Sequence, residues 1–335
     1  MDIRSTYGEK GRKKQVALFV GATSGLGLEA MKKWIFLLGE EGGKIYFVGR
    51  NKEVGEEIIE DFRRHHAHVP VTFIHSPDLS LLSESARVAD IVASKESHLN
   101  LIVLSQGELD LSDAPTLTPE GLDRKLSLNV YSRYLIARRL IPLLLKSYEY
   151  EQSTEVNRRA MAFSPPRVIS IFSPGFEGPI NEDDLSLSKP ENYSMKQCII
   201  QSAAMNSLMM EQLSNMYPGL GWIHVYPGIV RTNITRNMPE WIKTTAPVVG
   251  LFVAEKAAEV KEGIAYLATR KRAGLQLVDW HGMSWDSRDG ESHGNLWDVG
   301  LGKYLGTGGK WWREGLAEKI WQHQEEVEKR VLGEQ

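Results

Sequence analysis

Gln15–Val20 (QVALFV) runs directly into Gly21-Ala22-Thr23-Ser24-Gly25-Leu26-Gly27, and apolar residues at helical spacing follow as far as Leu38. The opening stretch is short and rich in apolar residues, which is typical of a buried strand. Glycines after such a strand allow a tight turn and a close approach of the backbone to a pyrophosphate, and the amide groups that open the helix attract its charge. This stretch therefore predicts a strand, a phosphate-binding loop and a helix.

Strand-like and helix-like patterns alternate along the rest of the chain. Short apolar runs fall at residues 44–49, 69–74, 101–105, 167–172 and 222–226, with a further one at 274–280. Apolar residues recur at helical spacing in 27–38, 54–65, 83–95, 121–147 and 203–216, and again in 311–332. Such alternation favours a parallel sheet with helices on both faces. We therefore predict an α/β chain with a Rossmann-type, doubly wound parallel sheet.

Composition narrows the class of protein. The chain has 335 residues, of which 42% are hydrophobic and 25% charged, and a formal net charge of -3. These proportions are ordinary for a globular protein, and the charge argues against nucleic acid as a partner. Cys198 is the only cysteine, so no internal disulfide can form, which fits a reducing compartment. Because residues 1–14 are polar and no apolar run has the length of a membrane span, we expect a cytoplasmic protein.

The end of the second predicted strand indicates which dinucleotide is bound. It reads Val48-Gly49-Arg50-Asn51. In a dinucleotide-binding fold this point meets the adenosine ribose, where an acidic residue would bind the 2′-hydroxyl of NAD. Arg50 instead offers a guanidinium suited to a 2′-phosphate, so the sequence predicts NADP(H).

The glycine spacing in residues 21–27 resembles the short-chain dehydrogenase/reductase family, and further landmarks follow in the family's order. Asp78-Leu79 follows the third strand, Ser105-Gln106-Gly107 follows the fourth, Asn129 precedes Pro142 on a helix, Ser173 ends the fifth strand, and Pro227 opens Pro-Gly-Ile-Val-Arg-Thr. Val20 and Ser105 depart from the family's usual Thr and Asn. The resemblance implies cofactor contacts from Gly21, Thr23, Ser24, Gly25, Leu26, Gly27, Arg50, Asn51, Asp78, Leu79, Ser105, Gly107, Asn129, Pro227, Gly228, Val230 and Thr232.

The catalytic pair of that family is a tyrosine and a lysine four positions later on one helix. The lysine lowers the pKa of the tyrosine, and the tyrosine exchanges a proton with the substrate oxygen. This chain offers Tyr193 and Lys196, three positions apart. Counting back from Pro227 places Gln197 and Gln201 at the family's two positions instead.

Two interpretations of this segment stay open. In the first, a local shift of the helix start makes Tyr193 and Lys196 the catalytic pair, with Ser173 orienting the substrate oxygen and Asn129 in a proton relay. In the second, Tyr193 is a loop residue and Gln197 and Gln201 occupy the two positions. Glutamine can hydrogen-bond but cannot act as an acid or base. Redox chemistry would then be lost, or would use another acid, such as Asp183, Asp184 or His224.

The remainder of the chain indicates a substrate and an organisation. We expect an NADP(H)-binding domain in residues 1–268, including a substrate lid at about 236–256, and a Trp-rich and Gly-rich extension in 269–335 packed on it. The apolar lid region suggests a hydrophobic small-molecule substrate. The Trp-rich tail looks like reductases of fungal secondary-metabolite pathways. The resemblance implies an NADP(H)-dependent carbonyl reductase or alcohol dehydrogenase. The alternative is a protein that catalyses a non-redox step (isomerase, cyclase or dehydratase) or only binds NADP(H).

Three groups of residues are expected to have structural rather than functional roles. Arg133, Arg138 and Arg139 are expected on a solvated helix face. Met205, Met209, Met210 and Met216 pack in the core or form a subunit contact of a homo-oligomer. His65, His66, His68 and His75 lie without partners at metal-ligand spacing, so no metal site is expected.

Overall fold

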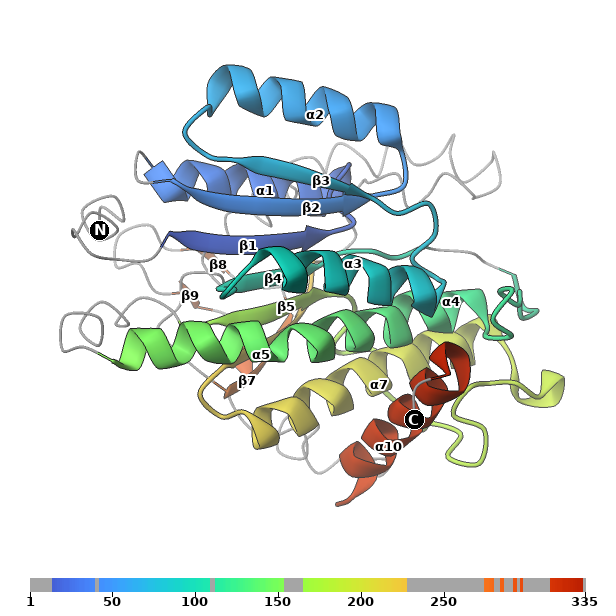
Figure 1. Cartoon of the computed structure of the whole chain (residues 1–335). Helices are drawn as coiled ribbons and strands as arrows, with labels where there is room; N and C mark the ends of the chain where they lie inside the picture. The colour runs from blue at the N-terminus through green and yellow to red at the C-terminus, as the bar shows by residue number, and fades with distance from the viewer. Residues whose placement is uncertain are drawn as a thin grey trace.

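The computed structural model describes residues 14–39, 42–108, 112–153, 165–227 and 314–333, together with the backbone of four short strands between 274 and 297. Among these residues the main sheet has eight strands, in the order β10-β7-β6-β5-β4-β1-β2-β3 (Figure 1). Across the sheet from β3 at one side to β7 near the other, every pair of neighbouring strands is parallel. β10 forms the edge beyond β7 and runs antiparallel to it. This is the predicted doubly wound arrangement.

The bounds of β1 to β7 match the seven predicted runs to within two residues, whereas β8, β9 and β10 were not predicted. The strands are β1 (Gln15–Val20), β2 (Gly43–Gly49), β3 (Val71–His75), β4 (Leu101–Leu104), β5 (Arg167–Ile171), β6 (Gly221–Tyr226), β7 (Gly274–Asp279) and β10 (Leu296–Trp297), with β8 (Ser284–Trp285) and β9 (Ser292–His293) paired separately. The strand order reverses between β1 and β4, so the carboxyl ends of these two strands meet at the place where α/β sheets bind ligands.

Helices cover both faces of the sheet, because successive side chains of each strand point to opposite faces. Val16, Leu18 and Val20 of β1 are buried in the cluster that also holds α3, α5 and α7 side chains. Ala17 and Phe19 are buried on the other face with α1 and α2. Figure 1 shows α3, α5 and α7 in front of the sheet and α1 behind it. The helices are α1 (Gly25–Leu38), α2 (Lys52–His65), α3 (Leu82–Lys95), α4 (Arg124–Leu126), α5 (Ser132–Gln152), α7 (Met195–Met216) and α10 (Leu316–Leu332).

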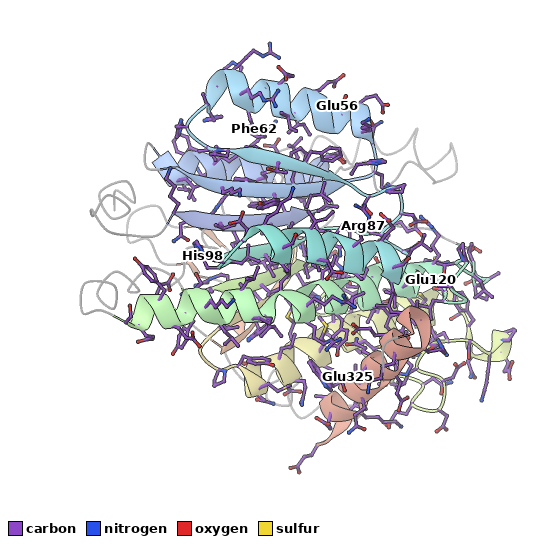
Figure 2. The ribbon with its side chains drawn as sticks, in the orientation of Figure 1. Glu56, Phe62, Arg87, His98, Glu120 and Glu325 are labelled. Atoms are coloured by element: carbon purple, nitrogen blue, oxygen red, sulfur yellow. The ribbon has the colours of Figure 1, made fainter. Side chains whose placement is uncertain are left out.

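The helix predicted over 121–147 is interrupted in the structure. α4 passes into a π-helical turn, Ser127–Tyr131, before α5 begins. α3 starts without a capping side chain of its own, and the carboxylate of Glu120 accepts hydrogen bonds from the amides of Leu82 (2.6 Å) and Ser83 (3.0 Å) instead (Figure 2 labels Glu120). The segment before α4 is therefore tied to α3.

α10 packs against α7 and α3 and buries Leu316, Ile320 and Val327. Its Glu328 is 2% exposed and pairs with Arg138 of α5 (Nη2 to Oε2, 2.6 Å). The expectation of a solvated arginine face is therefore wrong, because α10 covers it.

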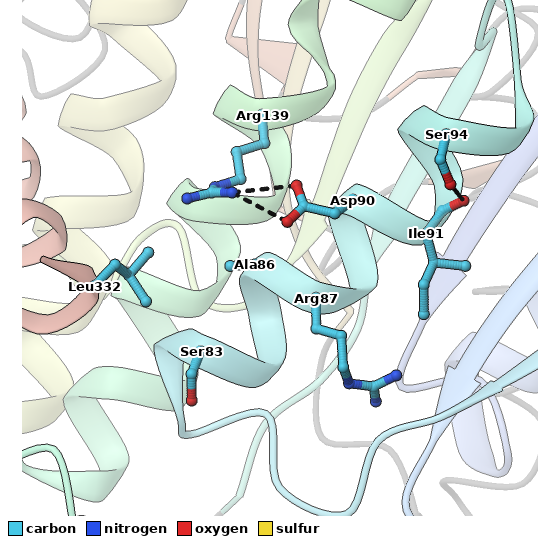
Figure 3. Close-up of a pocket in the computed structure, with 8 residues that line it drawn as sticks. All are labelled: Ser83, Ala86, Arg87, Asp90, Ile91, Ser94, Arg139 and Leu332. Atoms are coloured by element: carbon cyan, nitrogen blue, oxygen red, sulfur yellow. Dashed lines mark hydrogen bonds and ion pairs between the residues drawn. The ribbon is translucent and has the colours of Figure 1, made fainter. Parts of the chain in front are cut away.

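The other two arginines of α5, Arg139 and Arg133, are not freely solvated either. Arg139 donates to both carboxylate oxygens of Asp90, at 3.1 and 3.3 Å, in a hollow between α3 and α5 (Figure 3). Arg133 is 1% exposed. Of the four methionines of α7 considered above, Met205, Met209 and Met210 lie in the core, whereas Met216 is 43% exposed. Among the described helices, none combines the length and apolar character needed to cross a bilayer.

Candidate active site

The glycine loop has the geometry that a phosphate needs. Gly21 adopts φ +79°, a conformation that disfavours side chains, and a Cβ there would lie 2.6 Å from the Gln106 amide nitrogen. A Cβ on Gly27 would lie 2.2 Å from the Ser105 Oγ, so glycine lets α1 approach β4 closely. Ser24 precedes α1 in extended conformation and its side chain makes no capping hydrogen bond. The first-turn amides of α1 are therefore not covered by the usual cap, and no acidic residue stands in that turn.

The end of β2 lies beside this loop. A Cβ on Gly49 would collide with the Thr23 side chain, so Thr23 and the β2 end are in close contact. Arg50 follows on the surface, and its carbonyl oxygen is 3.1 Å from His75 Nε2. Asn51 caps α2 by accepting from the Val54 amide at 2.9 Å. Arg50 is thus an exposed residue that directly follows Gly49, the residue in contact with Thr23 of the glycine loop.

Asp78 is held by a neighbour that the sequence did not indicate. Arg124 of α4 lies 2.5 Å from its Oδ2, and Ser80 donates to its Oδ1 from both amide (3.0 Å) and hydroxyl (2.7 Å). Burial raises the pKa of Asp78, but these hydrogen bonds outweigh it and the pKa lies below its ordinary value. Asp78 is therefore a fixed anion. The neighbouring Leu79 side chain is buried in the core.

The end of β4 meets the π-helical turn. Ser105 donates to the Val20 carbonyl at 2.7 Å and so ties β4 to the glycine loop. Asn129 lies in the π-helical turn, and its carbonyl oxygen accepts from Asn206 Nδ2 at 2.8 Å. Asn129 Oδ1, 3.4 Å from a Cβ placed on Gly107, is buried and has no hydrogen-bond partner among the described residues, and the same holds for Gln106 Oε1. Buried polar atoms of this kind indicate that the site accepts a further polar group.

Arg133 is a buried residue next to the candidate site, although the sequence predicted it on a solvated helix face. Its guanidinium donates to the carbonyls of Leu104 (2.8 Å) and Gln106 and to Ser170 Oγ (2.7 Å). Burial lowers its pKa to about 9. It also lies over the Phe172 ring, 5.2 Å from the centroid. Through these hydrogen bonds Arg133 connects the carboxyl ends of β4 and β5.

Ser173 is half-buried just beyond β5, and its hydroxyl makes no hydrogen bond within the described residues. Its amide donates to His224 Nε2 of β6 at 3.3 Å. Burial, followed by the charge of Arg133, lowers the pKa of His224 to about 3, so this imidazole is neutral. His224 accordingly does not act as an acid near neutral pH.

Tyr193 and Lys196 do not form a pair. α7 begins at Met195, so Tyr193 precedes the helix, and its hydroxyl donates to Asp123 Oδ2 at 3.2 Å. Burial, with the neighbouring Cys198 and Asp123, raises the pKa of Tyr193 far above its ordinary value. Lys196 is exposed on the first turn of α7. In this structure Tyr193 lies before α7 and Lys196 on its exposed first turn, and the assignment of the catalytic residues stays a prediction.

Gln197 and Gln201 lie one turn apart on α7 and are joined by a 3.3 Å hydrogen bond from Nε2 to Oε1. Gln197 also donates to the Pro179 carbonyl at 3.1 Å. Gln201 is fully buried; it accepts from the Asn181 amide (2.9 Å) and donates to the Leu185 carbonyl (2.8 Å). Both glutamines therefore bind the main chain of the loop between β5 and α7.

Some predicted residues lie outside the described part of the chain. Pro227 is described at the end of β6, but Gly228, Val230 and Thr232 are not, and neither is the predicted lid at about 236–256.

Comparison with known proteins identifies a family match for the first part of the chain. Residues 15–152 match the family model described as short chain dehydrogenase. The oxidoreductase andH of Emericella variicolor is 32% identical over 219 residues, which are 65% of this chain and 58% of andH. The oxidoreductase lepF of Aspergillus flavus is 31% identical over 224 residues, 67% of this chain and 60% of lepF. Residues 15–152 therefore match the short-chain dehydrogenase family, and the chain is similar to these two oxidoreductases.

Solved structures agree with this short-chain dehydrogenase/reductase fold. The RhlG/NADP active-site complex of Pseudomonas aeruginosa superposes with a TM-score of 0.55 at 20% sequence identity, covering 82% of this chain and 96% of RhlG. The chain spans about three fifths of the length of the two oxidoreductases above.

Proposed function

We propose that the chain is an NADP(H)-dependent oxidoreductase that reduces a carbonyl group of a hydrophobic small molecule or oxidises the corresponding alcohol. One observation carries the proposal: the first turn of α1, without a side-chain cap, opens at the carboxyl ends of parallel strands, beside Arg50. Pyrophosphate fits such a turn because its charge meets the helix N-terminus and glycines give it room.

The residues present fit the cofactor. The amides of Gly25, Leu26 and Gly27 would hold the pyrophosphate, and Arg50 the 2′-phosphate of NADP(H). The unpartnered Asn129 Oδ1 lies at the end of β4, where a polar group of the cofactor or substrate would satisfy it. When bound, the reduced nicotinamide supplies a hydride. The RhlG complex supports NADP as the ligand of this fold.

The substrate would lie next to Ser173. Its hydroxyl, which has no partner among the described residues, is suited to donate a hydrogen bond to a substrate oxygen. Phe176 is 47% exposed and stands edge-on to Tyr226, with ring centroids 5.0 Å apart. These rings at the carboxyl ends of β5 and β6 favour a hydrophobic substrate, such as a fungal secondary metabolite.

We also propose that residues 1–268 are the dinucleotide-binding domain and 269–335 an extension packed on it. The burial of Leu316, Ile320 and Val327 of α10 against the main helices supports this division. Whether two copies associate is a separate question, which size-exclusion chromatography with light scattering answers directly.

A second function is favoured by the two glutamines. Because Gln201 uses both ends of its amide on the loop between β5 and α7, α7 offers no acid at the family's two positions. The chain could then bind NADP(H) and catalyse a non-redox step, as an isomerase, cyclase or dehydratase, or only bind the cofactor.

One experiment separates these functions. Purified protein is mixed with NADPH and a panel of hydrophobic ketones, and the absorbance of the reduced nicotinamide is followed together with product formation. The oxidoreductase consumes NADPH, and Ser173→Ala lowers the rate. Conversion of substrate without loss of NADPH supports the non-redox function. Protein that neither binds nor consumes NADPH contradicts the proposal.

A further inference from the structure

The structure leaves the proton donor of the proposed reaction unassigned. Gln197 and Gln201 cannot ionise. The carboxylate of Asp184 accepts hydrogen bonds from Ser188 (2.8 Å) and Asn192 (2.9 Å), and despite burial its pKa is lowered below the ordinary value. Asp184 is therefore an anion that carries no proton near neutral pH.

Glu177 has a carboxyl group and, like Ser173, lies beyond the carboxyl end of β5. It lies four residues after Ser173, in the loop that follows β5. Its Oε1 accepts from Ser207 Oγ of α7 at 2.6 Å, and its Oε2 accepts from the Gly175 amide at 2.6 Å. The carboxyl group is thus fixed between the loop and the middle of α7.

A chain of hydrogen bonds connects Ser173 to Glu177. The Ser173 amide can only donate, so His224 Nε2 accepts (3.3 Å) and the neutral imidazole carries its proton on Nδ1. His224 Nδ1 then donates to Ser207 Oγ at 2.8 Å, which leaves the Ser207 hydroxyl hydrogen for Glu177. Each hydrogen bond in this series points toward Glu177, whose carboxylate oxygen is the final acceptor.

We propose that Glu177 is the acid that protonates the substrate oxygen in reduction, and the base that takes the proton in oxidation. The proposal rests on the oxidoreductase function above. Because both neighbours of its carboxyl group donate, a proton on Glu177 has no acceptor within the chain of hydrogen bonds and is available to an outside oxygen. The same two donors stabilise the carboxylate that is left.

The step balances. As the carbonyl carbon takes the hydride that the reduced nicotinamide supplies, the carbonyl oxygen takes the Glu177 proton; the carboxyl O–H bond breaks and a carboxylate remains. Water returns the proton to Glu177 between turnovers. The products are an alcohol and the oxidised dinucleotide.

The surroundings of Glu177 keep its proton at higher pH than usual. Burial raises its pKa, the hydrogen bonds from Ser207, from its own main-chain amide and from Gly175 lower it, and the net pKa lies above the ordinary value. The titratable groups on packed elements are His224 and Tyr226 of β6 and Arg133 of α5, and α7 has none between Cys198 and Glu211. Its own loop continues to Glu182 and Asp183. Arg133 is separated from His224 by the Phe172 ring, which stacks on His224 at 6.4 Å.

The first test compares Glu177→Gln with Glu191→Gln, an exposed glutamate before α7. In reduction, kcat of Glu177→Gln should fall about 100-fold or more, the usual contribution of a general acid, while Glu191→Gln matches the wild type. NADPH affinity, measured by thermal shift, should be equal in all three proteins. Equal kcat in Glu177→Gln and Glu191→Gln overturns the assignment, whereas a wild type that binds no NADPH overturns the proposed function instead.

The second test reads the proton itself. Infrared difference spectra of the free protein, wild type minus Glu177→Gln, should show the carbonyl stretch of a protonated carboxylic acid that titrates above the ordinary range of glutamate. Ser207→Ala removes a hydrogen bond that lowers the pKa, so it should move this titration, and the alkaline limb of kcat against pH, to higher pH. A carboxylate already ionised at acidic pH, or a limb that Ser207→Ala leaves in place, contradicts the proposal.

Discussion

Replacing Gly27 with alanine should break the phosphate loop from inside. The new Cβ would lie 2.2 Å from Ser105 Oγ and 2.7 Å from the Gly21 carbonyl oxygen. The Ser105 hydroxyl can rotate away only by giving up its 2.7 Å hydrogen bond to the Val20 carbonyl. The Gly21 oxygen is backbone, so the first turn of α1 must move relative to the loop.

The size of the effect follows from these two contacts. A lost hydrogen bond costs about 1 kcal/mol, and overpacking a close contact about 1–3 kcal/mol. Gly27→Ala should therefore lower the free energy of unfolding by about 2–4 kcal/mol. If the displaced turn also loses one amide–phosphate hydrogen bond, about 1.5–3 kcal/mol, NADPH binds about 10–100-fold more weakly.

Two measurements check this: urea unfolding for stability and calorimetric titration for NADPH affinity. The double variant with Ser105→Ala removes the Oγ and its contact, so part of the stability lost in Gly27→Ala should return, while the contact with the Gly21 oxygen persists. A Gly27→Ala protein within about 0.5 kcal/mol of the wild type, the range of a neutral substitution, refutes the reasoning.

Three other predictions concern single side chains. Arg50→Ala should weaken NADPH binding by about 10–100-fold, the worth of a hydrogen-bonded charge pair, and leave NADH affinity nearly unchanged; an equal loss for both cofactors in a titration would show that Arg50 does not meet the 2′-phosphate. Tyr193→Phe should lower the free energy of unfolding by about 1–2 kcal/mol, because Asp123 loses a buried donor, and urea curves that coincide with the wild type would argue against that bond. Burial lowers the pKa of His323, which hydrogen-bonds Tyr131 at 2.8 Å, from 6.5 to about 4. Because the unfolded chain takes up a proton that the folded one does not, the free energy of unfolding should fall between pH 6.5 and about pH 4, and His323→Gln should flatten that fall in urea unfolding measured across this window.

Local pattern was sufficient for the sheet and for the glycine turn between β1 and α1. Short runs such as Gln15–Val20 are apolar at every position after the first because parallel strands are buried on both faces, so they can be recognised from composition alone. α7 was harder. The prediction began it at residue 203, yet it starts at Met195, because Ser194 caps it by accepting from the Gln197 amide at 3.0 Å.

The site was less predictable because its key contacts join residues far apart in sequence. Arg133 resembled a surface arginine, but the carbonyls that satisfy it belong to Leu104 and Gln106, and no sequence pattern shows that they converge on it. Glu177 also lacked a signal, since its partner Ser207 lies 30 residues away on α7. Tyr193 showed the reverse: a spacing close to the family's pair suggested catalysis, and its buried bond to Asp123 suggests a structural role.

Calorimetric titration of the wild-type chain with NADPH tests the central claim, that the opening of α1 and the Arg50 corner bind a phosphorylated dinucleotide. The account predicts measurable heat, one NADPH bound per chain, and weaker binding of NADH. No heat and no thermal stabilisation at saturating NADPH would contradict it.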